Sequence, residues 1–323
     1  MKAIVHHRYG PPADVLRLED IPRPAVGDDD VLVRVRAAGV NAADWHLVTG
    51  APYIMRGTGF PLRRPKDIVP GWDVAGEVEA VGGDVTGFRP GDEVFGWCRG
   101  GFAEYVSAPA DSFVAKPEGV TSEQAAAVPV AAITALQALR DGGQVRPGQQ
   151  VLITGASGGV GTFAVQIAKS LGAEVTAVCS TRNMQMVRSI GADHVIDYTR
   201  DDFTRAGIGY DVIVDIAGLP SLTGCRRSLA SDGILVMITG DGGPWLGPLP
   251  RMAAAAARFA LGSRRFRLVS AKPTPEDLAV LADLVATGTI TPVVDRTYQL
   301  TETPEAVRYV EEGHTRGKVV VTV

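Results

Sequence analysis

The hydrophobic and polar positions follow two different patterns along the chain. Between residues 2 and 120, apolar residues occur in short runs that alternate with polar ones or are rich in β-branched side chains. Turns rich in glycine and proline separate these runs, which predicts a compact, mostly antiparallel β domain. The expected strands are residues 3–5, 31–36, 74–81, 92–95 and 103–107.

From about residue 121 to residue 284, expected strands alternate with helices. An alanine-rich helix opens this part, and Thr121 or Ser122 is a suitable cap for it. The last residues, 292–323, return to short strands and a helix that begins near Thr303. The expected parallel strands are Val151–Thr154, Val175–Cys179, His194–Ile196, Val212–Asp215 and Ile234–Thr239.

These patterns predict an α/β protein in which a doubly wound parallel sheet is inserted between two parts of a β-rich domain. We place the β-rich domain at residues 1–122 and 291–323, and the parallel-sheet domain at residues 123–290. Two domains also fit the length of 323 residues. The expected active site is the cleft between these two domains.

A glycine-rich turn lies near the start of the parallel-sheet domain. The strand that ends at Thr154 leads into Ala156-x-Gly158-x-x-Gly161, and a helix over Thr162–Leu171 follows. The small first residue permits the turn, Gly158 lets a pyrophosphate approach the backbone, and Gly161 allows close packing of helix on strand. The helix N-terminus adds unpaired N–H groups and a positive dipole end. The motif predicts a Rossmann-type dinucleotide site, and the alternative is a turn with only a structural role.

The residues after the next strand, Glu174–Cys179, indicate which dinucleotide is bound. An NAD site usually has Asp or Glu at this point for the ribose hydroxyls, whereas this chain has Ser180-Thr-Arg182-Asn. Hydroxyls and a guanidinium suit a dianionic phosphate, which favours NADPH over NADH. The alternative is that Ser180 only caps the next helix and that Arg182 is solvated.

Composition and charge exclude several other classes of protein. The chain is 46% hydrophobic and 21% charged with a net charge of -4, so no nucleic-acid partner is expected. No apolar run is long enough for stable membrane insertion. Three cysteines without paired spacing (Cys98, Cys179 and Cys225) and an N-terminus without signal-peptide features predict free thiols and a cytoplasmic protein.

The segment Gly242–Arg267 combines apolar residues with several arginines. A basic, apolar helix of this kind can lie on a membrane surface. It can equally cover a substrate or form a subunit contact. Because the segment directly follows the strand that lines the expected cofactor site, we favour a substrate lid or a subunit interface.

Several motifs together resemble the medium-chain dehydrogenase/reductase superfamily, and the resemblance covers essentially the whole chain. It is closest to the zinc-free quinone oxidoreductase branch, including the mitochondrial reticulon-interacting reductases. The similarity implies a GroES-like β domain, a Rossmann domain and a homodimer. The motifs are Val40–Asp44, Pro70–Val78, Arg89–Val94, Gly155–Gly161, Leu171–Ala173, Gly191–Tyr198 and Gly317–Val320.

The chain departs from the zinc-dependent alcohol dehydrogenases of this superfamily. Where those enzymes place zinc-binding Cys and His residues, this chain has Asn41 and Trp72, and the lobe with four cysteines is absent. These changes remove a thiolate and an imidazole, both typical zinc ligands. The five histidines also lack the spacing of a ligand cluster. We therefore expect no catalytic metal.

The resemblance implies two catalytic residues. Asn41 matches a polar residue near the nicotinamide and would stabilise a developing anion on the substrate, although it can also be a turn-forming asparagine. Tyr53 resembles the family's active-site aromatic and would donate a hydrogen bond or a proton, although it can also be a packing residue. For Asp44 we expect a structural ion pair with Arg316.

The cofactor contacts are likewise implied by the resemblance. Tyr198 would stack on the adenine or reach its phosphate, and Gly218 would let the nicotinamide approach the backbone. The segment His314–Lys318 resembles a second cofactor clamp, and its alternative is a polar hairpin. The phosphate loop and the adenosine-phosphate site are matched by Ser157, Gly158, Gly159, Val160 and Ser180, and the clamp contains His314, Arg316, Gly317 and Lys318.

These observations predict a zinc-independent NADPH oxidoreductase that transfers hydride directly to quinones or α,β-unsaturated carbonyls. One alternative is an alcohol or aldehyde reductase of the same fold. Another is a regulatory, crystallin-like or RNA-binding protein that keeps NADPH without turning it over.

Overall fold

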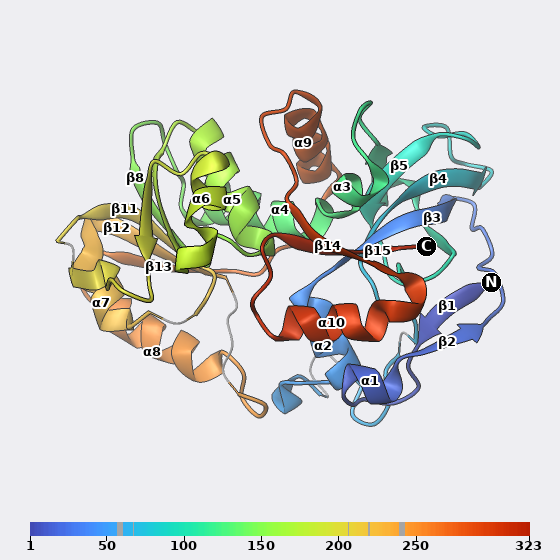
Figure 1. The fold of residues 1–323 in the computed structure, drawn as a ribbon, viewed down its shortest axis with the longest axis horizontal. Helices are drawn as coiled ribbons and strands as arrows, with labels where there is room; N and C mark the ends of the chain where they lie inside the picture. The colour runs from blue at the N-terminus through green and yellow to red at the C-terminus, as the bar shows by residue number, and fades with distance from the viewer. Residues whose placement is uncertain (57–60, 67, 206, 219, 239–242) are drawn as a thin grey trace. The chain divides into compact units, whose positions relative to one another are not determined.

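The computed structural model describes residues 1–56, 61–66, 68–205, 207–218, 220–238 and 243–323. The chain divides into two compact units (Figure 1). Unit 1 contains Met1–Ile133 and Pro273–Val323, and unit 2 contains Thr134–Lys272. Unit 2 is therefore inserted in the chain between the two parts of unit 1.

Unit 1 is built on a seven-stranded sheet in the order β14-β15-β3-β4-β5-β7, and β6 also pairs with β3. All pairs are antiparallel except β14 with β15, which are parallel. A separate antiparallel pair is formed by β1 (Lys2–Val5) and β2 (Arg17–Asp20). The strands of the larger sheet are β3 (Asp30–Val40), β4 (Asp73–Val81), β5 (Glu93–Trp97), β6 (Tyr105–Pro109), β7 (Phe113–Ala115), β14 (Val294–Gln299) and β15 (Lys318–Thr322).

The helices of unit 1 explain why its limits differ from the predicted domain limits at residues 122 and 291. Thr121 caps α3, because its hydroxyl accepts from Gln124 N and the Gln124 side chain accepts from Thr121 N. Helix α3 then packs on β3 and β4, and α9 packs on β7, so both helices join unit 1. The helices are α1 (Pro12–Val15), α2 (Ala42–Thr49), α3 (Ser122–Ala126), α9 (Pro275–Ala286), α10 (Thr303–Glu311) and α4 (Pro129–Gln137), which continues into unit 2.

Unit 2 is a parallel sheet of six strands in the order β10-β9-β8-β11-β12-β13. This is the doubly wound order of a Rossmann fold, which confirms the predicted fold class. Val151, Leu152 and Ile153 of β8 are fully buried, as expected of a central strand. The strands are β8 (Gln150–Thr154), β9 (Glu174–Cys179), β10 (His194–Asp197), β11 (Tyr210–Asp215), β12 (Leu229–Ile238) and β13 (Arg265–Val269), and the helices are α5 (Gly159–Ser170), α6 (Met184–Ser189), α7 (Leu222–Ser228) and α8 (Leu249–Phe259).

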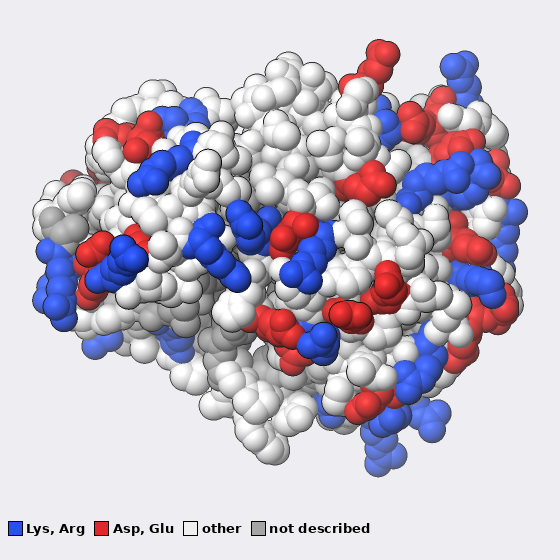
Figure 2. Space-filling view, in the orientation of Figure 1, with Lys and Arg blue, Asp and Glu red and all other residues white. Residues whose placement is uncertain are grey.

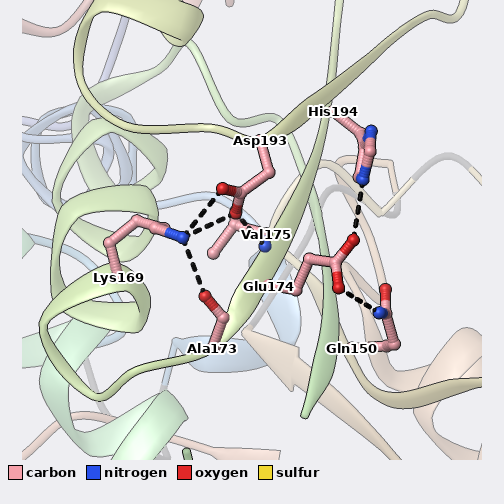
Figure 3. Close-up of polar contacts among 7 residues, drawn as sticks. All are labelled: Gln150, Lys169, Ala173, Glu174, Val175, Asp193 and His194. Carbon is pink, nitrogen blue, oxygen red and sulfur yellow. Dashed lines mark hydrogen bonds and ion pairs between the residues drawn. The ribbon is translucent and has the colours of Figure 1, made fainter. Parts of the chain in front are cut away.

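A polar network joins the amino-terminal ends of β8, β9 and β10, at the sheet edge opposite the glycine-rich turn (Figure 3). Glu174 pairs with His194 Nε2 at 2.8 Å and also accepts from the Gln150 side chain, and these two bonds, that with His194 first, hold the pKa of Glu174 below its usual range. Lys169 pairs with Asp193 at 2.7 Å. His194 is thus part of a structural network.

The segment predicted as a lid or interface contains α8 and β13, and its first residue, Gly242, lies outside the described residues. Strand β13, which the sequence reading missed, extends the parallel sheet beside β12. Ala255 and Phe259 of α8 are buried in the core of unit 2, whereas Trp245 and Leu261 are exposed. The segment is therefore partly a structural component of the Rossmann unit.

The distribution of charged side chains, the apolarity of the helices and the state of the cysteines complete the description of the fold. On the face in Figure 2, cationic and anionic side chains are interspersed. No helix among the described residues is both long and apolar enough to cross a membrane. The three cysteines are buried and free, as predicted, and burial raises the pKa of Cys179 to about 11 and that of Cys225 to about 12.

Candidate functional site

The glycine-rich turn forms an open cradle at the head of α5. A Cβ atom added to Gly158 would meet only Gly155 O, at an ordinary 3.5 Å, among the described residues. A Cβ atom on Gly161 would lie 2.1 Å from the same oxygen, so this glycine is needed for close packing. Gly155 has a φ of 65° and Ala156 is fully buried. The loop therefore fits a diphosphate against bare backbone at a helix N-terminus.

Asn183 ties the loop after β9 to the glycine-rich turn. Its Nδ2 donates to Ser157 Oγ at 2.9 Å, and only 3% of the residue is exposed. The Asn183 Oδ1 atom is buried without a hydrogen-bond partner among the described residues. The sequence alone assigns Asn183 no role, because its contact with Ser157 depends on how two loops meet at the edge of the sheet.

The residues after β9 and β10 lie at the same edge of the sheet, since Asp197 is opposite Cys179. Ser180 makes no side-chain bond to the turn that follows it, so its alternative role as a cap is not observed. Asp197 is buried, and its carboxylate accepts from the Thr181 and Thr199 hydroxyls, which lower its pKa. Arg182 is exposed on this edge.

A cavity of about 360 Å³ opens beside the cradle within unit 2. It lies at the carboxyl ends of the parallel strands, where open α/β sheets bind their ligands. Tyr198 is 55% exposed. The cavity lining includes Thr154, Gly155, Val178, Tyr198, Ala217 and Ser221.

Asp215 organises the loop that contains Gly218. Its Oδ1 accepts from Thr154 Oγ1 at 2.8 Å and from Gly218 N at 3.0 Å. Its Oδ2 accepts from Arg251 of α8 at 2.8 Å, and Arg251 also donates to Pro220 O. The Asp215 side chain is fully buried. Sequence reasoning did not assign roles to Asp215 or Arg251, because their pairing depends on how α8 packs.

In unit 1, Asn41 immediately follows β3 and precedes α2. The residue is 7% exposed, and its side chain bonds to Asp73 and Lys318. Lys318, predicted in the cofactor clamp, is itself only 3% exposed. The structure thus brings two predicted site residues, Asn41 and Lys318, into direct contact, together with Asp73, which was not predicted.

The predicted ion pair between Asp44 and Arg316 is wrong. Asp44 is fully buried, and its oxygens accept from Asn41 N at 2.8 Å and Gly71 N at 3.1 Å. Arg316 is exposed, and its backbone N donates to Asp295. Loss of solvent, which outweighs the hydrogen bonds, raises the pKa of Asp44 to about 7.

Tyr53 lies on a short turn, Tyr53–Met55, and is 40% exposed. The Arg56 guanidinium lies 4.7 Å from the centre of its ring. A second cavity, of about 180 Å³, opens within unit 1 and is lined in part by Leu47 of α2, Gly71 and Trp72. His314 and Gly317 lie in the turn before β15, where Gly317 has a φ of 103°.

The described residues contain no group of three His, Cys, Asp or Glu side chains arranged to hold a metal ion. A phosphate-binding loop of this kind on a doubly wound sheet defines a dinucleotide-binding protein. Unit 1 carries the remaining predicted site residues, including Asn41, Tyr53 and Lys318.

Comparison with known proteins identifies the family. The model described as an alcohol dehydrogenase GroES-like domain matches residues 27–118, and the zinc-binding dehydrogenase model matches residues 190–321. The chloroplastic quinone-oxidoreductase QR1 of Triphysaria versicolor is 33% identical, over 99% of this chain and 98% of that protein. The mitochondrial NAD(P)H oxidoreductase RTN4IP1 of Mus musculus is 34% identical, over 100% of this chain and 89% of that protein.

Solved structures of quinone oxidoreductases and related proteins also match this chain. The quinone oxidoreductase from Coxiella burnetii matches with a TM-score of 0.86 and 32% identity, over 100% of this chain and 99% of that one. The mycobacterial protein Rv1454c, solved with NADPH, matches with a TM-score of 0.82 and 30% identity over all of both chains. The chain belongs to the quinone oxidoreductase branch of the medium-chain dehydrogenase/reductase superfamily.

Proposed function

We propose that the protein reduces quinones or α,β-unsaturated carbonyls with NADPH and without zinc. The observation that carries this proposal is the buried Asn41 amide, held by Asp73 and Lys318 where zinc-dependent relatives place a thiolate ligand. An amide engaged in this way is a poor zinc ligand but a suitable hydrogen-bond donor. The relatives named for quinone reduction support the same conclusion.

The cofactor would bind along unit 2. The cradle at Gly158 accommodates the diphosphate, and the cavity beside Tyr198 accommodates the adenosine. Ser180 and Arg182 favour a 2′-phosphate, and the buried acid at the end of β10, Asp197, already accepts from Thr181 and Thr199. The relative solved with NADPH supports this choice. When bound, NADPH supplies the hydride.

The residues of unit 1 would supply the electrostatics of the reaction. Negative charge develops on the substrate oxygen as hydride reaches the electrophilic carbon, and a fixed Asn41 N–H stabilises that charge. Tyr53 is exposed enough to donate a hydrogen bond or a proton. Leu47 and Trp72 give the cavity of unit 1 an apolar wall that suits a planar ring.

The test is NADPH oxidation, followed by absorbance, across a panel of quinones, enones, aldehydes and ketones. We expect turnover with quinones or enones, no stoichiometric zinc by elemental analysis, and full activity after chelator treatment. Loss of activity with chelator would refute the zinc-free mechanism. Turnover of aldehydes alone would indicate an alcohol or aldehyde reductase, and tight NADPH binding without any turnover would indicate a binding protein.

A further inference from the structure

Three polar side chains meet at one end of the β sheet of unit 1. Asn41 follows the last residue of β3, Asp73 begins β4 and Lys318 begins β15. Strand β3 pairs with both other strands, so Gly39 lies opposite Asp73 and Val40 opposite Val319. Neighbouring strand ends therefore assemble side chains from distant parts of the chain.

The three side chains form a closed hydrogen-bonded network. Lys318 Nζ lies 2.6 Å from Asn41 Oδ1 and 3.0 Å from Asp73 Oδ2. Asn41 Nδ2 donates to the same Asp73 oxygen at 2.9 Å. The other Asp73 oxygen accepts from Val130 N at 2.9 Å. Exposure of the three residues is 7%, 0% and 3% for Asn41, Asp73 and Lys318, so water does not compete for these bonds.

The close approach of these elements depends on Gly39. A Cβ atom at this position would lie 2.3 Å from Ala126 O and 3.0 Å from Asp73 Oδ2. The side chain of any other residue would therefore push α3 or the Asp73 carboxylate away. The network sits in a tightly packed region where its members have little freedom to rearrange.

Its members permit only one orientation of the Asn41 amide. An ammonium group can only donate, so the atom facing Lys318 must be the Asn41 oxygen. A carboxylate can only accept, so the atom facing Asp73 must be the Asn41 nitrogen. A flipped amide would oppose donor to donor and acceptor to acceptor. One Nδ2–H remains without a partner among the described residues.

We propose that Asp73 and Lys318 are positioning residues that hold the Asn41 amide in this orientation and leave its second Nδ2–H as a preoriented donor. The Lys318 ammonium also polarises the amide through its oxygen, which strengthens the remaining N–H as a donor. The catalytic part of this inference rests on the proposed function, in which that N–H binds the substrate oxygen. Lys318 acts through Asn41 and not as a direct clamp on the cofactor.

The orientation of the amide is tested without any substrate. Because the chain contains only two asparagines, protein made with ¹⁵N-asparagine has two side-chain amide nitrogen signals, each with two protons, and Asn41→Ala assigns them. We expect Lys318→Met to shift the Asn41 signal and to accelerate its hydrogen exchange about tenfold or more, while the Asn183 signal stays unchanged. An unchanged Asn41 signal would overturn the inference.

A matched control removes another largely buried ammonium of unit 1. Lys116 has a side chain that is 8% exposed and bonds to Val120 O and Glu93. Lys116→Met should leave the Asn41 signal unchanged. If Lys318→Met fails to fold because Asp73 is left unpaired, the double variant Asp73→Ser/Lys318→Met removes both charges without adding a third asparagine, and it replaces the single variant in both experiments. A shifted Asn41 signal in Lys116→Met would show that the effect is not local and would refute the inference.

The kinetic test is a double-mutant cycle. Asn41→Ala should lower kcat about 100-fold, as expected on removing a donor to a developing anion. Lys318→Met should lower kcat about tenfold with unchanged NADPH affinity, and should cause no further loss in the Asn41→Ala background. Equal losses in both backgrounds, or weaker NADPH binding, would refute the positioning role. A wild-type protein without turnover would refute the proposed function, while the amide signal still decides the orientation.

Discussion

Alanine at Gly158 should weaken cofactor binding with little effect on stability, whereas alanine at Gly161 should destabilise the fold. In Gly158→Ala the new methyl group meets only Gly155 O, at 3.5 Å, and the residue has an ordinary φ of -85°. Stability should therefore change by less than about 1 kcal/mol. The methyl group instead occupies the space where a diphosphate would approach the backbone.

Overpacking of this kind costs about 1–3 kcal/mol, which corresponds to an NADPH affinity about 5- to 150-fold weaker. In Gly161→Ala the methyl group would lie 2.1 Å from Gly155 O and 2.7 Å from Ala156 backbone atoms. Because backbone atoms cannot shift without disturbing the turn, a similar cost of about 1–3 kcal/mol lowers the free energy of unfolding. A Tm lower by at least about 3 °C is expected.

Thermal unfolding followed by circular dichroism and titration with NADPH followed by fluorescence measure the two effects. Wild-type NADPH affinity in Gly158→Ala would show that no diphosphate lies against this residue. A wild-type Tm in Gly161→Ala would show that the helix does not pack on the turn as closely as the geometry requires. Either result would refute the reasoning from the cradle.

Three further predictions concern charge. Burial raises the pKa of Asp44 to about 7. The folded state then binds more protons than the unfolded state between about pH 4 and 7, so this group's stabilising contribution falls as pH rises, by up to about 1.4 kcal/mol per unit. The free energy of unfolding of wild type minus that of Asp44→Asn, measured in urea, should decline over this range, and a rise would show that Asp44 is ionised. Arg182→Ala should weaken NADPH binding much more than NADH binding, and equal losses would show that Arg182 does not contact the phosphate. Arg251→Met leaves Asp215 buried without its cation and should cost about 3 kcal/mol in urea unfolding, with partial recovery in Asp215→Asn/Arg251→Met. No recovery would mean that the loss came from packing.

The phosphate cradle could be predicted because all of its determinants are local. A strand, a turn and a helix follow one another within about twenty residues, and each glycine acts through backbone geometry that neighbouring residues define. The alternation of short strands in unit 1 and of strands with helices in unit 2 is equally local. Five of the six parallel strands were predicted from this pattern, whereas their order in the sheet comes from the structure.

The limits of the two units and the existence of strand β13 were harder to predict from the sequence. The assignment of α3 and α9 to unit 1 depends on which sheet each helix packs against, and that packing is decided by residues far away in the chain. Strand β13 contains two arginines among its five residues, Arg265–Val269, and most of these residues are exposed, so its composition resembles a solvated segment. Its position at the sheet edge is what makes that composition acceptable.

By itself the sequence determined the two classes of sheet, the insertion of one unit into the other and the dinucleotide turn, because these depend on residues close together in the chain. Only the tertiary structure decided the partners of the buried polar groups. Asn41 and Lys318 are 277 positions apart, and their contact exists because the register of β3, β4 and β15 aligns their ends. No periodicity within one strand encodes the register between strands. For the same reason, the expected partner of Asp44 was wrong: its burial, set by the surrounding fold, favours backbone N–H groups over an exposed arginine.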